Sequence, residues 1–128
     1  MSLRMSMKEF AAIDKQPKKS KYKNKIAYVD DIRFDSLAEA AYYERLKILQ
    51  KAGEVSHFLM QVPFVLPGPV RYRLDFLVFY SDGAVDYIDI KGKPTAEFKT
   101  KKKLVAALYP VKIRCLGRKG YNFYEKDV

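Results

Sequence analysis

The chain has 128 residues, 48% of them hydrophobic, and a formal net charge of +10 at pH 7. This length suits one domain with its own core, and the charge favours a polyanionic partner such as nucleic acid. The single cysteine, Cys115, excludes a disulfide framework and a zinc cluster. No segment approaches the roughly 18 apolar residues of a membrane helix, so we expect a cytoplasmic protein.

Residues 1–24 are polar and rich in lysine. Such a segment buries too little apolar area to order itself, so we predict a flexible basic arm that follows nucleic-acid phosphates. A disordered tail that only improves solubility is the alternative. Residues 25–128 are predicted to form a single domain, which begins with a short hairpin or strand at residues 25–29 and 32–34.

The first helix is predicted from Ser36 or Leu37 to about Ala52. Ser36 is a suitable N-cap, and Gly53 suits the left-handed position after a helix end. Glu39 completes a capping-box pattern with Ser36. Helical spacing places Leu46 at the margin of one apolar stripe. The predicted members of the stripe are Leu37, Ala38, Ala41, Tyr42, Ile48, Leu49 and Ala52.

Two strands are predicted next, from Val55 to Leu66 and from Arg71 to Tyr80, joined by a turn at Pro67-Gly68-Pro69. Pro63 lacks a backbone donor, so the first of these strands should lie at a sheet edge or contain a bulge. In the second strand, Asp75 interrupts a run that is apolar on both faces. A buried carboxylate costs several kcal/mol unless its charge is compensated.

A hairpin follows this run. Ser81-Asp82-Gly83 has the composition of a three-residue loop that ends in a left-handed glycine. If Tyr80 and Ala84 close that loop, Asp75 stands opposite Asp89. Two facing like charges destabilise a sheet on their own.

A divalent cation would reverse the sign of that cost. Carboxylate oxygens are ligands that Mg²⁺ prefers, and Mn²⁺ takes the same ligands. Lys91 lies two residues after Asp89, so both side chains point to one face of the strand, and the lysine would stand beside the metal. The hairpin therefore predicts a metal site with Asp75 and Asp89 as ligands.

The second helix is predicted from a cap at Thr95 to about Leu108. Its buried side should carry Phe98, Leu104, Val105 and Leu108. Its other side carries lysines that are placed to hold phosphates: Lys99, Lys102 and Lys103. A merely solvated lysine face is the alternative. Residues 111–116 are predicted as a core strand, which can pair in parallel because a helix precedes it, and residues 121–125 as an edge strand.

Asp75 followed by Asp89-Ile90-Lys91 resembles the D…(D/E)xK signature of the PD-(D/E)xK nuclease superfamily, with Leu74 in place of the usual proline. The superfamily includes many restriction enzymes and Holliday junction resolvases. The stretch FDSLAEAAYYERLKIL, the segment Gln61-Val62-Pro63-Phe64 and the later D-F and D-x-K-G segments are most similar to a family of small phage-encoded proteins regarded as endonucleases. This resemblance covers roughly Tyr22 to Leu108.

The resemblance implies a restriction-endonuclease-like αβββαβ core, an α/β fold with a mixed central sheet flanked by helices. It implies that Asp75, Asp89 and Glu39 hold Mg²⁺ or Mn²⁺ and that Lys91 is catalytic. Glu44 is the substitute for Glu39, whose capping role is the other interpretation. Gln61 would orient the lysine, a water or a phosphate, with an ordinary strand glutamine as the alternative. The DNA contacts expected beside Gln61 are Lys93, Lys99, Lys102 and Lys103.

The predicted function is metal-dependent hydrolysis of DNA phosphodiester bonds, selective for branched DNA such as a Holliday junction, by a phage-related endonuclease in the bacterial or phage-infected host cytosol. A homodimer would place two sites on two strands. The first alternative is a non-catalytic basic nucleic-acid-binding module whose acids pair with Arg45, Arg73 or Lys91. A ribosomal or RNA-binding protein fits the charge but leaves the facing aspartates unexplained.

Overall fold

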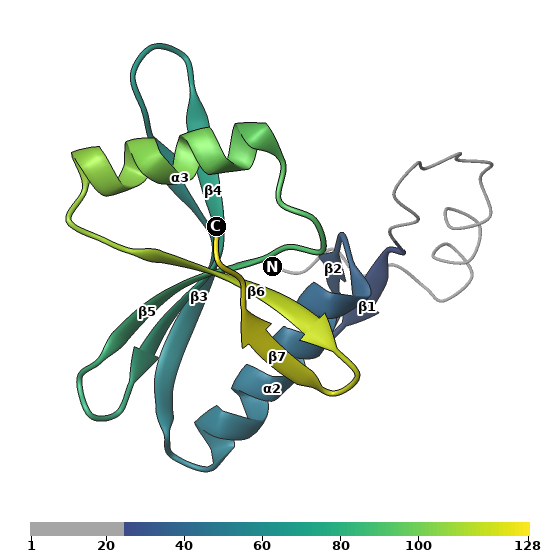
Figure 1. Cartoon of the computed structure of the whole chain (residues 1–128). Coiled ribbons are helices and arrows are strands. Elements are labelled where there is room, and N and C mark those ends of the chain that lie inside the picture. Colours follow the sequence, from purple (N-terminus) through teal and green to yellow (C-terminus); the bar gives the residue numbers. More distant parts are fainter. Residues whose placement is uncertain (1–24) are drawn as a thin grey trace. The chain divides into compact units, whose positions relative to one another are not determined.

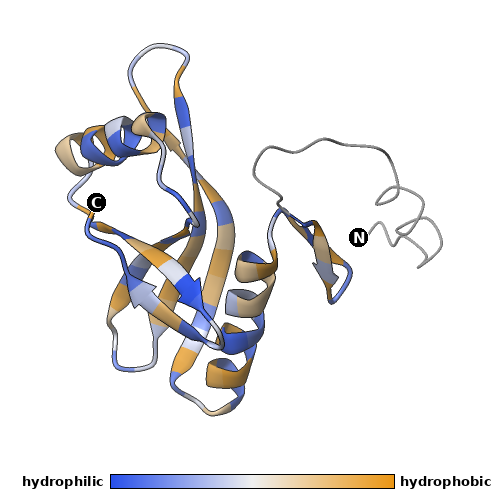
Figure 2. Ribbon diagram, turned by 45° about the vertical axis from the view of Figure 1, so that its right-hand side comes forward, coloured by the Kyte–Doolittle hydropathy of each residue, from blue (hydrophilic) through white to orange (hydrophobic). Residues whose placement is uncertain are grey.

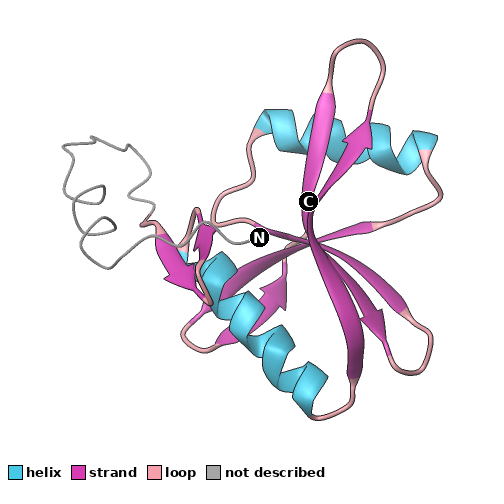
Figure 3. Ribbon diagram, turned by 180° about the vertical axis from the view of Figure 1, so that it is seen from behind, coloured by secondary structure: helices cyan, strands magenta, loops and turns pink. Residues whose placement is uncertain are grey.

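The computed structural model describes residues 25–128, so the predicted basic arm lies outside the described residues. The described part has a mixed α/β architecture with two helices, a hairpin and a five-stranded mixed sheet (Figures 1 and 3). The chain divides into two compact units, residues 1–45 and residues 46–128, so the single domain stays a prediction. The elements are β1 (Ala27–Val29), β2 (Ile32–Phe34), α2 (Leu37–Lys51), β3 (Val55–Val65), β4 (Arg71–Tyr80), β5 (Val85–Ile90), α3 (Ala96–Leu108), β6 (Ile113–Lys119) and β7 (Asn122–Glu125).

The first unit contains the predicted hairpin. Asp30 and Asp31 connect β1 to β2, with φ angles of 52° and 64°, the left-handed backbone that a two-residue hairpin turn requires. The hydroxyl of Tyr43 on α2 donates a hydrogen bond to the Asp30 carboxylate at 2.7 Å, and its ring lies 5.2 Å from that of Phe34. Burial, with this bond, raises the pKa of Tyr43 to about 12. Within this unit the hairpin and the start of α2 are therefore held by specific contacts.

Helix α2 has the predicted bounds but a different buried side. Leu46 is fully buried, although we expected it at the margin of the apolar stripe, whereas Leu37 and Ile48 are 49% and 67% exposed. The other buried residues are Ala40, Tyr42 and Tyr43. The predicted apolar stripe is therefore centred on the wrong side of the helix, because the buried side includes Leu46 and leaves Leu37 and Ile48 exposed. Large aromatic rings and their partners, such as Phe34 with Tyr43, decide which side is buried, and helical spacing alone does not see them.

The second unit is built on the five-stranded sheet, in the order β3-β4-β5-β6-β7. Neighbouring strands are antiparallel except β5 and β6, which pair in parallel across the α3 connection, as predicted. Strand β3 is an edge strand, which confirms the expectation drawn from Pro63. The helix, three strands, helix and strand also follow one another in the predicted order.

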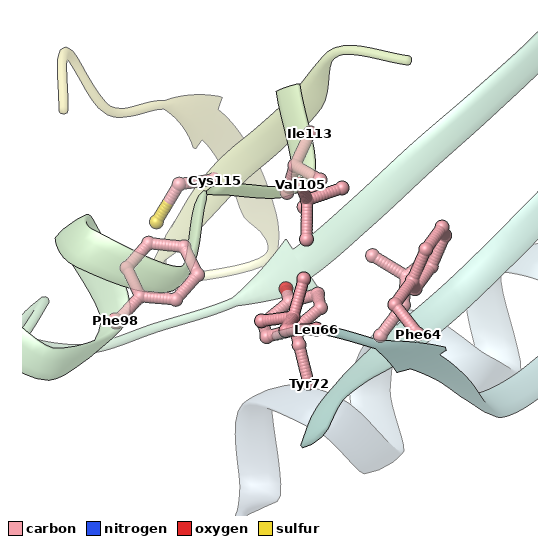
Figure 4. Close-up of a cluster of buried hydrophobic side chains, with 8 residues drawn as sticks. Phe64, Leu66, Tyr72, Phe98, Val105, Ile113 and Cys115 are labelled. Carbon is pink, nitrogen blue, oxygen red and sulfur yellow. The ribbon is translucent and has the colours of Figure 1, made fainter. Parts of the chain in front are cut away.

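Helix α3 packs on one face of this sheet. Thr95 caps it, with its hydroxyl accepting a hydrogen bond from the Phe98 amide at 3.1 Å. The helix is amphipathic, and its apolar residues join a buried cluster with the strands (Figures 2 and 4). Leu108, predicted to be buried, is 51% exposed because the chain leaves the helix at Tyr109. The buried cluster consists of Phe64, Leu66, Tyr72, Leu74, Phe98, Val105, Ile113 and Cys115.

The hairpin between β4 and β5 has the predicted register. The Tyr80 amide donates to the Ala84 carbonyl at 2.9 Å, and Gly83 has a φ of 93°. Phe76 pairs with Ile88, as a loop of residues 81–83 requires. In the part of the chain that the structure describes, no helix is long and apolar enough to cross a membrane.

Candidate metal centre

Asp75 lies where the β4–β5 ladder ends. The last ladder pair is Phe76 with Ile88, one position short of Asp75 and Asp89. Beyond it the backbone amide of Ile90 donates to Oδ2 of Asp75 at 2.8 Å. The Asp75 carboxylate therefore lies beside the backbone that directly follows Asp89. The two aspartates are neighbours, as predicted. Beyond the last ladder pair, however, the Asp75 side chain joins β4 to β5 through its bond from the Ile90 amide.

Asp89 is the most unusual acid of the described chain. Its side chain is 1% exposed, and neither carboxylate oxygen has a hydrogen-bond partner among residues 25–128. Asp89 forms an ion pair with Lys91, whose Nζ lies 3.5 Å from Oδ2 of Asp89. A buried carboxylate with two unbonded oxygens is costly in free energy. These oxygens are suited to accept a cation or its bound waters.

Tyr72 lies between the two acids and the buried cluster. Its hydroxyl is buried and has no hydrogen-bond partner among the described residues. Burial, then the charge of Asp89, the close approach of the Asp89 carboxylate to this hydroxyl and the charge of Asp75 raise the pKa of Tyr72. Both carboxylates therefore lie within electrostatic reach of one neutral hydroxyl. Figure 4 shows the Tyr72 ring packed in the cluster near Leu66.

Lys91 extends from the end of β5. Its ammonium lies 5.2 Å from the centroid of the Phe98 ring, in addition to its ion pair with Asp89. The lysine side chain is 37% exposed, whereas Asp89 is buried. A cation over an aromatic face is held in place and partly shielded from water. Lys91 therefore reaches solvent, whereas the acid with which it pairs does not.

Gln61 faces Asp75 from β3 with a strained backbone. Its φ is 54°, left-handed for a residue in the middle of a strand, which costs roughly 1–2 kcal/mol for a side chain other than glycine. Its neighbours pair with Phe76 and Leu74, so Gln61 lies across from Asp75. The Gln61 amide donates to Oδ1 of Asp75 at 3.4 Å, a long bond. Strain of this kind persists where the surroundings hold a residue in place, and it gathers at functional sites.

Strand β4 is also irregular at this point. Leu74 and Leu77 are three residues apart, yet both pack against the same buried cluster. Strict alternation would place them on opposite faces, so the alternation is interrupted between them, at Asp75. The interruption lies across from Gln61. Distortion of both strands thus coincides with the acid.

Ser36 caps α2 through the Glu39 amide, which is one of the two bonds of the predicted capping box. The Ser36 hydroxyl accepts from the Glu39 amide and donates to the Glu39 carboxylate, both at 3.1 Å. Glu39 belongs to the first unit and the aspartates to the second, so its place in the metal site stays a prediction. Glu44, the substitute, is exposed on α2. Among residues 25–128, no group of three or more acids, histidines or cysteines is placed to hold a metal ion.

The predicted DNA contacts lie in the second unit. Lys93 is exposed in the segment after β5, and Lys99 and Lys103 are exposed on α3. Lys102 is partly buried and donates to the backbone oxygen of Val128 at 3.0 Å.

Tyr72 and the neighbour of Asp89 on β6 carry no local motif that marks them as part of a site. That neighbour is Cys115, which pairs with Asp89 in the parallel ladder. Burial raises the pKa of the Cys115 thiol, and Asp89 raises it further. The parallel pairing places these residues together, and pairing between distant strands is not visible in a local motif.

Comparison with known proteins gives one match. Searches of curated proteins and of solved structures find nothing that matches this chain. A family model described as a protein of unknown function, DUF1064, matches residues 19–118. The match covers most of the chain and spans both aspartates, Lys91 and the whole of α3. The chain therefore belongs to the DUF1064 family, whose function is unknown.

Proposed function

We propose that this protein is a metal-dependent endonuclease that hydrolyses DNA phosphodiester bonds. The observation that carries the proposal is Asp89, a buried carboxylate with two unbonded oxygens. Asp75 lies beside it, held by the Ile90 amide, and Lys91 stands on its solvent side. A purely structural aspartate would be expected to have its oxygens bonded.

The donor set suits magnesium or manganese. Mg²⁺ is usually held by one or two carboxylates, with waters and substrate phosphates completing its coordination. Asp75 and Asp89 would hold the ion, and a third protein acid is not required. Glu39 would join them directly or through water. The bound ion would lower the pKa of a water molecule and stabilise charge that develops on the phosphate.

The protein side chains have separate roles in this proposal. Lys91 neutralises the charge of the phosphate in the transition state or orients the attacking water. Asp75 is oriented by the Ile90 amide on one oxygen and by Gln61 on the other. The Phe98 ring restricts the Lys91 ammonium. Hydrolysis adds water across one phosphorus–oxygen bond, so no other reactant is needed.

The fold fits the proposal. The order of helix, three strands, helix and strand, with β5 and β6 parallel, is what a restriction-endonuclease-like core would have. The charge of +10 supports a nucleic-acid substrate. By resemblance we favour branched DNA such as a Holliday junction, cut by a homodimer of phage-related origin.

The second candidate is a nucleic-acid-binding module without catalysis. The ion pair between Lys91 and Asp89 favours it, because a structural role for the acid would need such a partner. The pair is 3.5 Å long and Lys91 is part exposed, so it compensates the buried charge only weakly. We therefore rank this candidate second.

The test is a cleavage assay on a labelled four-way junction, with matched linear duplex and single strand, in Mg²⁺, Mn²⁺ or EDTA. We expect metal-dependent cleavage by the wild type and at least a roughly 100-fold loss of rate for Lys91→Ala. Lys119→Ala removes an exposed lysine at the far end of β6 and serves as the control. DNA binding by Lys91→Ala should stay close to that of Lys119→Ala.

Two results would contradict the proposal. Binding without cleavage in every metal would favour the binding module. Cleavage that survives in EDTA, or that Asp89→Asn does not reduce, would remove the aspartates from the reaction. The substrate that is cut fastest identifies the structural preference.

A further inference from the structure

A cavity of about 200 Å³ lies between α3 and the start of β6. Four lysines line it: Lys99, Lys102 and Lys103 from the helix and Lys112 from the segment before the strand. Val111 and Ile113 are among its apolar lining residues. We call this the lysine pocket. It differs from a flat lysine face because the four side chains line one partly open hollow.

The charges of the lysine pocket are poorly balanced. No aspartate or glutamate side chain is among its lining residues. On the same helix, Lys101 pairs with Glu97 at 3.4 Å, but neither residue lines the pocket. Four lysine side chains that share one cavity concentrate positive charge in one region, and an anion bound there would lower the repulsion between them.

One lysine of the pocket already donates a hydrogen bond to an oxygen of the protein. The Lys102 ammonium donates a hydrogen bond to the backbone oxygen of Val128 at 3.0 Å, and Val128 also lines the pocket. This contact shows that an oxygen acceptor fits at the lysine. The remaining three lysines are exposed, and a phosphate group would supply acceptor oxygens for them.

The pocket lies close to the aspartates. Ile113 lines it, and Cys115, two residues further along β6, pairs with Asp89. Two residues of a strand span about 7 Å, close to the axial rise of two nucleotides in one DNA strand.

We propose that the lysine pocket binds a phosphate group of the nucleic acid, one or two nucleotides from the phosphate that is hydrolysed. This placement rests on the proposed nuclease function, whereas phosphate binding itself does not. The pocket would fix the strand so that the next phosphates reach Asp75 and Asp89. Phosphate contacts of this kind set position without reading sequence.

The first test measures binding of inorganic phosphate without metal, by calorimetry or NMR titration. The variant carries Lys103→Ala and Lys112→Ala, which leave the Lys102 contact with Val128 intact. The control carries Lys47→Ala and Lys119→Ala, two exposed lysines outside the pocket, and has the same net charge. We expect at least tenfold weaker phosphate binding for the pocket variant and less than a twofold change for the control. Equal losses, or no measurable phosphate binding by the wild type, would overturn the proposal.

The second test uses short duplexes with 5′-phosphate or 5′-hydroxyl ends. Equal affinity for both would identify an internal phosphodiester as the ligand, and tighter binding of the phosphorylated end would identify a terminal phosphate. In either case the pocket variant should lower the salt dependence of log K by about 0.9, the value for one phosphate. An unchanged salt dependence would contradict phosphate binding in the lysine pocket.

The two proposals fail separately. Phosphate binding that depends on the pocket, with no cleavage under any metal, would refute the nuclease and keep the pocket. Cleavage by a pocket variant that binds phosphate and DNA as the wild type does would refute the pocket alone.

Discussion

Strand β5 carries two aspartates, three residues apart, in opposite surroundings. Asp86 accepts hydrogen bonds from the Arg114 guanidinium and, at 3.3 Å, from the Tyr80 hydroxyl. Arg114 also binds Glu125 at 3.0 Å, so the charge belongs to a network. Asp89 is more deeply buried, yet its oxygens have no hydrogen-bond partner among the described residues. The difference is the one expected between an acid that stabilises the fold and an acid that, under the proposed function, binds a metal ion.

The same substitution at the two sites should have opposite effects on stability in EDTA. Asp86→Asn removes charge-assisted bonds and should lower the free energy of unfolding by about 1.5–3 kcal/mol. Asp89→Asn removes a buried charge that Lys91 compensates only weakly, and it should raise this free energy by roughly 1 kcal/mol or more. Urea denaturation of the two variants and the wild type measures both changes.

Stabilisation by a metal ion is a second way to compare Asp86→Asn with Asp89→Asn. At tenfold its Kd, Mg²⁺ or Mn²⁺ should stabilise the wild type by about 1.4 kcal/mol, and Asp86→Asn by the same amount. Asp89→Asn should lose this response. Destabilisation of Asp89→Asn in EDTA, comparable to that of Asp86→Asn, would show that both acids serve the fold.

Gln61 offers a further test of the metal site, because it has a strained backbone and its side-chain amide bonds Asp75. Gln61→Gly should be more stable than Gln61→Ala by roughly 1–2 kcal/mol, since glycine adopts a φ of 54° without steric cost. Both variants lose the amide that bonds Asp75, so both should bind Mn²⁺ about tenfold more weakly. Denaturation and metal titration separate the two effects. Wild-type Mn²⁺ affinity in both variants would show that the amide does not orient Asp75.

The smallest expected effect is at Tyr72. Tyr72→Phe removes a buried hydroxyl that has no hydrogen-bond partner in the described structure, so the free energy of unfolding should change by less than about 1 kcal/mol. Tyr80→Phe, which removes a hydroxyl bonded to Asp86, is the control and should cost about 1 kcal/mol. A larger loss at Tyr72 than at Tyr80 would mean that the Tyr72 hydroxyl bonds Asp89 in solution, which would weaken the contrast between the two acids.

Local chemistry predicted much of the fold. Ser36, Thr95 and Gly53 mark helix ends because capping depends on a few consecutive residues. Ser81-Asp82-Gly83 predicted the hairpin register because a three-residue loop determines which residues pair. The buried side of α2 was predicted wrongly around Leu46, because burial depends on which aromatic and aliphatic side chains meet from other elements.

The candidate site, like the fold, was predicted only in part. Asp75, Asp89 and Lys91 were visible as charges in apolar strands. The Ile90 amide that binds Asp75, the left-handed backbone of Gln61 and the cavity that the four lysines line were not visible. Each of these depends on how strands and helices distant in sequence approach one another.

Spacing along the chain is enough to predict the helix ends, the β4–β5 hairpin and the residue types of the site. How each charge is compensated depends instead on contacts between distant segments. The tertiary structure paired Asp86 with Arg114, 28 residues away, and left the oxygens of Asp89 without hydrogen bonds from the described residues. The cost of a buried charge depends on its three-dimensional surroundings, and those exist only once the sheet and helix α3 are packed.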